Sequence, residues 1–137
     1  MSEKSEIGFI SGGILNISPK EAFELSKSGF ILIDVREEYL NSFKIPDIDN
    51  VLYFPKSNID KDYLNLPESK KLIFFDSVGI RSKEVVLFLK EKGFENIVNM
   101  VGGIVDWEKD KLPMKTNIEE RLTGSCMCQL KPRDRKK

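Results

Sequence analysis

The residues best suited to chemistry lie in two places, a tail with two thiols and a short acidic loop. Cys126 and Cys128 are separated by one residue, so in an extended chain their side chains point the same way. Two such sulfurs could bind one soft metal ion, exchange a disulfide or pass a persulfide from one to the other. The neighbouring Lys131, Arg133 and Arg135 favour the reactive thiolate. Two thiolates cannot complete a tetrahedral zinc site without a second chain, so we predict no metal and no cofactor.

The acidic loop has the sequence Asp76-Ser77-Val78-Gly79-Ile80-Arg81-Ser82. Gly79 permits close approach of the backbone, and Arg81 adds a fixed positive charge. Backbone N–H groups at the start of the following helix point to the same place. We interpret this loop as an anion cradle. Asp76 and Arg81 are its candidate catalytic residues. The candidate ligand-binding residues are Ser77, Val78, Gly79, Ile80 and Ser82.

The absence of histidine from the chain narrows the possible reactions. It excludes histidine general bases, Cys-His and Ser-His pairs, and every zinc site that contains histidine. Asp76 could act as a nucleophile only with a metal and further carboxylates, which the adjacent loop residues do not supply. The chain also has no GxxxxGK[ST] or GxGxxG phosphate-binding motif and no internal repeat.

The elements that position the loop are a buried strand and a helix. The apolar run 72–75 has the length and composition of a buried strand, and an apolar helical pattern follows from residue 85. We predict Ser82 as the N-cap of this helix. Gly93 followed by Phe94 predicts a Schellman ending in which Phe94 packs on Leu89.

Strands and helices alternate along the rest of the chain. Ser18, Pro19 and Glu21 form a capping box for a helix that extends to about Lys27. Apolar runs at 30–33, 51–54 and 96–100 predict further strands. This alternation indicates an α/β fold with a parallel sheet of about five strands, covered by helices on both faces. Ligands of such sheets bind at the carboxyl ends of the strands, where the Asp76 loop lies.

Four ordered motifs resemble those of the rhodanese-like family, the single-domain sulfurtransferases. The loop of that family has the pattern Cys-x-x-Gly-x-Arg-Ser, which Gly79, Arg81 and Ser82 match. The family motif Gly-His-Ile-Pro-Gly-Ala survives only as Ile45-Pro46, and the two remaining motifs are an Ile-Asp-Val-Arg-Glu segment at 33–37 and Gly-Gly-x-x-x-Trp at 102–107. The departure is Asp76, which stands where the family places its persulfide-carrying cysteine.

The resemblance assigns structural roles to three further residues. Asp34 and Arg36 are expected to form an ion pair that fixes a loop, in preference to a catalytic role. Trp107 is expected to fill the core, in preference to stacking on a substrate, and the glycines ahead of it let the chain turn close to the loop.

The substitution at Asp76 governs the expected function. A carboxylate cannot hold a persulfide, so we do not expect classical thiosulfate sulfurtransfer at this loop, and phosphatase or arsenate reductase chemistry needs the same missing cysteine. Asp76 is expected to accept the loop N–H donors and to pair with Arg81. The predicted function is a noncatalytic binding or regulatory module for a protein partner or a small sulfur-containing or anionic ligand. The alternative is an atypical sulfurtransferase or persulfide carrier that uses Cys126 and Cys128.

Composition sets the remaining expectations. The 137 residues suit one domain, which we place at 14–113 between a flexible lead (1–13) and a tail (114–137) with the CxC motif and a basic end. The N-terminus resembles neither a secretory signal nor a membrane span, so we expect a cytoplasmic protein without a membrane partner. The basic end carries no motif for specific nucleic-acid binding. The sequence does not indicate an oligomeric state.

Overall fold

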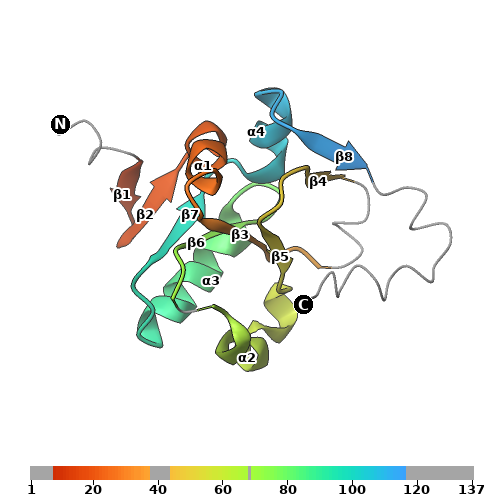
Figure 1. Cartoon of the computed structure of the whole chain (residues 1–137). Coiled ribbons are helices and arrows are strands. Elements are labelled where there is room, and N and C mark those ends of the chain that lie inside the picture. Colours follow the sequence, from red (N-terminus) through yellow and green to blue (C-terminus); the bar gives the residue numbers. More distant parts are fainter. Residues whose placement is uncertain (1–7, 38–43, 68, 117–137) are drawn as a thin grey trace, which may run out of the picture.

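The computed structural model describes residues 8–37, 44–67 and 69–116. Strands and helices alternate along most of this part of the chain (Figure 1). The strands are β1 (Phe9–Ser11), β2 (Ile14–Ile17), β3 (Ile31–Asp34), β4 (Lys44–Pro46), β5 (Val51–Tyr53), β6 (Leu72–Phe75), β7 (Ile97–Met100) and β8 (Met114–Thr116). The helices are α1 (Pro19–Ser26), α2 (Ile59–Asp62), α3 (Ile80–Glu91) and α4 (Gly103–Lys109), with 3-10 turns η2 (Lys56–Asn58) and η3 (Tyr63–Asn65) on either side of α2.

The main sheet has six strands in the order β1-β2-β7-β6-β3-β5. β2, β7, β6, β3 and β5 are parallel, and only β1 is antiparallel to its neighbour. β6 therefore lies inside the sheet, between β7 and β3. The predicted α/β fold with a mainly parallel sheet is confirmed.

Side chains of the central strand alternate between two cores. Leu72 and Phe74 pack on one face with buried residues of α3 and α2, whereas Ile73 and Phe75 pack on the other with buried residues of α1 and α4. All four side chains are buried, which is why β6 is a continuous apolar run rather than an alternating one. Figure 1 shows α1 and α4 on one side of the sheet and α3 and α2 on the other.

Part of the predicted flexible lead belongs to the sheet, which corrects its boundary. β1 pairs antiparallel with β2, and Ser11 lies opposite Ile14. The two residues between them, Gly12 and Gly13, both have positive φ (64° and 85°). Positive φ at both central positions suits a two-residue hairpin turn, so the glycines turn the chain back instead of ending a loose segment.

The start of the predicted tail is also part of the fold. β8, which begins at Met114, pairs antiparallel with β4 in a separate two-stranded sheet. The carbonyl of Pro113 accepts hydrogen bonds from Trp107 Nε1 (2.7 Å) and from the Asp47 amide (3.0 Å). These contacts hold the chain beside β4 just before β8 begins, so the described domain continues past residue 113.

Of three predicted helix ends, two follow the local sequence and one differs. The capping box of α1 is present, with the Ser18 and Glu21 side chains each bonded to the other residue's amide. At the end of α3, Gly93 has φ 98° and Phe94 N donates to Leu89 O at 3.1 Å, the predicted Schellman pattern. α3 itself begins at Ile80 with Gly79 as its N-cap, so the prediction of Ser82 as N-cap is wrong. No helix in the described part of the chain is long and apolar enough to span a membrane.

Candidate functional site

The Asp76 loop lies at the carboxyl end of β6, between the end of that strand and the start of α3. Ligands of parallel sheets bind at this edge, so the loop is the first candidate site of the domain. Asp76 is 1% exposed, whereas Val78, Ile80 and Arg81 are exposed. The loop therefore presents an apolar and basic outside around a buried carboxylate.

The Asp76 carboxylate accepts hydrogen bonds from the loop that encloses it. Oδ1 accepts from Gly79 N (2.5 Å), and Oδ2 accepts from Arg81 N (3.1 Å). Arg81 is the second residue of α3, so the carboxylate satisfies an N–H group of the first helical turn that has no partner within the helix. This explains the wrong N-cap prediction, because Asp76 performs the capping role expected of Ser82.

Ser82 belongs to a buried polar network that the sequence pattern did not predict. Its Oγ lies within hydrogen-bonding distance of Asp76 Oδ1 (3.2 Å) and of Asn99 Oδ1. Asn99 Nδ2 donates to Asn16 Oδ1 at 3.0 Å, and Asn16 Nδ2 donates to Ile14 O at 3.1 Å. The four side chains are at most 2% exposed and connect the loop, through β7, to the β1–β2 hairpin. The available signal was an asparagine inside each of two apolar strands, β2 and β7.

The predicted side-chain pair between Asp76 and Arg81 is absent, which is a correction. The residues are joined by the Arg81 backbone amide instead. None of the ion pairs among residues 8–37, 44–67 and 69–116 includes Arg81, and its side chain is exposed. Backbone N–H groups already occupy both oxygens of the buried carboxylate, so the guanidinium lies outside the loop.

The start of α4 holds the outer backbone of the loop. Ile104 N donates to Asp76 O and Val105 N donates to Ser77 O, both at 3.0 Å. Gly103 lies so close that an added Cβ would be 2.3 Å from Asp76 O and 2.5 Å from Ser77 O. Only glycine permits this contact, so the Gly-Gly pair brings α4 against the loop.

Asp34 and Arg36 lie at the neighbouring strand end and form a buried ion pair. Arg36 donates from Nε to Asp34 Oδ1 (3.0 Å) and from Nη2 to Oδ2 (2.9 Å). Nη2 also donates to Lys44 O at 2.8 Å, and the guanidinium carbon lies 5.7 Å from the centroid of the Phe75 ring. The pair therefore ties the end of β3 to β4 beside the loop and has little contact with solvent.

Trp107 is fully buried, with its ring edge against Phe23 at a centroid distance of 6.0 Å. It lies beneath the start of β8 and has no surface for substrate stacking. Cys126 and Cys128 lie outside the described residues, so their distance from the loop is not defined. In the described part of the chain, no group of three His, Cys, Asp or Glu residues is arranged to hold a metal ion.

Comparisons with known proteins point to one family. The family model described as the rhodanese-like domain matches residues 18–110. The chain is 29% identical over 107 residues to thiosulfate sulfurtransferase GlpE of Haemophilus influenzae (strain PittEE), covering 73% of this chain and 93% of that protein. It is 34% identical over 101 residues to the probable adenylyltransferase/sulfurtransferase MoeZ of Mycobacterium tuberculosis (strain CDC 1551), covering 71% of this chain but only 25% of MoeZ. Among solved structures, a rhodanese-related protein from Thermoplasma volcanium superposes with a TM-score of 0.66 at 30% identity, covering 72% of this chain and 95% of that one.

Proposed function

The chain belongs to the rhodanese-like domain family, and we propose that in this member the Asp76 loop serves as a noncatalytic binding module instead of transferring sulfur. The proposal depends on Asp76 occupying the position of the family's nucleophile, as the loop resemblance implies. The observation that carries it is the closed state of the loop. The Asp76 carboxylate accepts the Gly79 and Arg81 amides, which are donors that an incoming anion would need.

The chemistry of the carboxylate supports the same conclusion. A persulfide requires a sulfur nucleophile, and Asp76 has none. Its side chain is 1% exposed, so a donor such as thiosulfate could reach it only after the loop had opened. Opening would break the contacts that Asp76 O and Ser77 O accept from the start of α4. A closed, internally bonded loop is suited to presenting a fixed outer surface to a partner.

The test is intact-mass spectrometry after incubation with thiosulfate. The reference protein carries Cys126→Ser and Cys128→Ser, so that any added sulfur must reside at residue 76. We expect no mass increase in this protein, and an increase of one sulfur atom once Asp76→Cys is added. Asp76→Ser in the same background is the matched control, since it removes the carboxylate without supplying a thiol. Circular dichroism would establish that each variant is folded.

Sulfur uptake by the reference protein, which has no cysteine, would overturn the assumption that residue 76 cannot accept sulfur. Failure of folded Asp76→Cys to take up sulfur from thiosulfate or from a persulfide donor would show that the loop is not a family cradle whose nucleophile is missing. Either result would remove the basis of the proposal.

A persulfide carrier that uses the tail is the second candidate. The observation in its favour is that both cysteines of the chain lie within three residues of each other, beside a basic end, in a chain whose relatives include a thiosulfate sulfurtransferase. Sulfur added to the wild-type chain and lost with Cys126→Ser or Cys128→Ser would establish this function. A cytoplasmic location, expected from the sequence, stays a prediction.

A further inference from the structure

Exposed apolar side chains lie on the closed loop and on the adjoining first turn of α4. Val78 is 49% exposed, Ile80 65% and Val105 47%. Val78 and Ile80 lie on either side of Gly79, and the Val105 amide donates to Ser77 O at 3.0 Å, so the three side chains come from backbone segments in direct contact. Together with the exposed Arg81 they form a surface that we call the loop rim. Apolar side chains left in water at a strand-end site are suited to contact with a partner.

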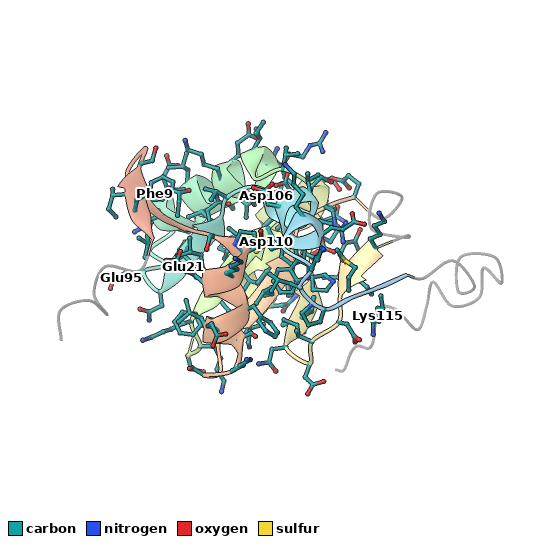
Figure 2. The ribbon with its side chains drawn as sticks, turned by 90° about the horizontal axis from the view of Figure 1, so that it is seen from above. Phe9, Glu21, Glu95, Asp106, Asp110 and Lys115 are labelled. Carbon is teal, nitrogen blue, oxygen red and sulfur yellow. The ribbon has the colours of Figure 1, made fainter. Side chains whose placement is uncertain are left out.

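Arg81 is the one charged residue of the loop rim, and acids on the two neighbouring helices each lie near a lysine. On α3, Glu84 forms an ion pair with Lys56 at 3.3 Å. On α4, Asp106 Oδ1 lies 3.9 Å from Lys109 Nζ, and Asp106 is labelled in Figure 2. Glu108 Oε2 lies 2.8 Å from Lys44 Nζ. Arg81 takes part in none of these pairs or in any other ion pair within the described ranges. The guanidinium is thus an exposed cation beside apolar side chains with no ion pair among the described residues, and it complements a carboxylate.

The shape of the site favours a polypeptide over a small molecule. Asp76 fills the interior of the loop, and its carboxylate already accepts the Gly79 and Arg81 amides that a small anion would need. A cavity of about 310 Å³ exists, but it lies at the opposite ends of β6 and β7 and is lined by Leu72, Ile97, Lys70, Lys92 and neighbouring residues. That cavity is therefore separate from the Asp76 loop and shares no residue with it. Contacts at the loop rim are therefore made on its outer surface, spread over two helices and a loop.

We propose that the loop rim binds a segment of a partner protein in which apolar side chains adjoin a carboxylate. The apolar side chains cover Val78, Ile80 and Val105, and the carboxylate forms a two-pronged pair with Arg81. Arginine is well suited to this role, because its planar fork matches a carboxylate and such residues often dominate interface affinity. This inference rests on the proposed binding function and specifies the chemistry of the partner.

The test is an NMR titration of the isotope-labelled full chain with three capped hexapeptide probes. One alternates leucine and aspartate, the second alternates leucine and lysine, and the third alternates serine and aspartate. We expect amide shifts at 77–82 and 105 with the first probe and much weaker effects with the other two. Loss of the charge pair in Arg81→Glu should weaken binding of the first probe by about tenfold or more. The Arg81 amide that donates to Asp76 remains in this variant, so the loop stays closed.

Matched variants separate a specific effect from a general one. Lys90→Glu makes the same change of charge at an exposed position in the last turn of the same helix, and should leave binding unchanged. Ile80→Ser should weaken binding, whereas Leu64→Ser, at a side chain 73% exposed in η3, should not. Equal binding of the basic probe, shifts confined to other surfaces, or no shifts at millimolar probe would overturn the inference. None of those results changes the outcome of the sulfur-uptake test. Failure of the loop-rim inference can therefore be distinguished from failure of the proposed function.

Discussion

Replacing Gly103 by alanine would place a methyl group in space that the Asp76 loop already occupies. The added Cβ would lie 2.3 Å from Asp76 O and 2.5 Å from both the carbonyl carbon and oxygen of Ser77, and none of these backbone atoms can swing aside. Gly103 also has φ 54°, a left-handed conformation that costs a non-glycine residue about 1–2 kcal/mol. Forcing the helix away from the loop adds about 1–3 kcal/mol of overpacking. We expect Gly103→Ala to lower the free energy of unfolding by roughly 2–5 kcal/mol in total.

Gly93→Ala is the matched control for backbone strain. Gly93 has φ 98°, but an added Cβ would have no neighbour within 4 Å, so this variant should lose only about 1–2 kcal/mol. Urea denaturation followed by circular dichroism measures both variants, with an unchanged slope as the sign that the same surface is exposed on unfolding. Equal destabilisation of the two variants would refute the argument that α4 is pressed against the loop. In the Asp76→Cys background, Gly103→Ala should also reduce sulfur uptake, because the displaced helix no longer fixes the loop.

Three further substitutions test the contacts around the loop. Asp34→Ala leaves the Arg36 guanidinium buried without its partner and should cost about 3–5 kcal/mol in a urea titration, while Glu108→Ala, at a half-exposed ion pair, should cost under about 1 kcal/mol. Asn99→Ala removes the middle of the buried polar network and should cost about 1–3 kcal/mol; an unchanged midpoint would show that the network contributes nothing to stability. Trp107→Phe loses a buried hydrogen bond and ring volume, so its thermal midpoint should fall by several degrees, and a midpoint equal to that of the wild type would contradict the assigned packing.

The fold was predictable where local chemistry and tertiary packing agree. The apolar run 72–75 became a strand buried on both faces, and the capping box at Ser18 begins α1. Gly12 and Gly13 were ambiguous, because two glycines suit either a loose end or a two-residue hairpin turn. The choice between them depends on β1 finding β2, which is a contact that no local pattern encodes. The same holds for β8, whose partner β4 lies far away in the sequence.

At the site, residue types were predictable but their partners were not. The sequence indicated that Asp76 would accept loop N–H groups, and Gly79 N is one of its donors. It did not reveal that the second donor would be the amide of Arg81 rather than its guanidinium. That outcome depends on how deeply the carboxylate is buried, because a buried carboxylate lies close to the backbone at the start of α3 and away from exposed side chains. Burial of this kind is set by the tertiary structure. The Asn16–Asn99 contact depends in turn on strand register, which aligns these residues on β2 and β7.

A carboxylate and a thiolate would place different demands on this loop. A carboxylate has two oxygens, so Asp76 can accept Gly79 N with one and Arg81 N with the other while Ser82 Oγ lies beside the first. A single sulfur atom in its place could not bridge the loop amide and the helix amide in the same way, and would leave donors for an incoming anion. In our proposal the Asp76 carboxylate thus occupies the donors that an anionic ligand would otherwise use. The loop is therefore closed without a bound ligand. Recognition then takes place on the outer surface, where the exposed Arg81 guanidinium is available to a partner while the Arg81 amide stays bonded to Asp76.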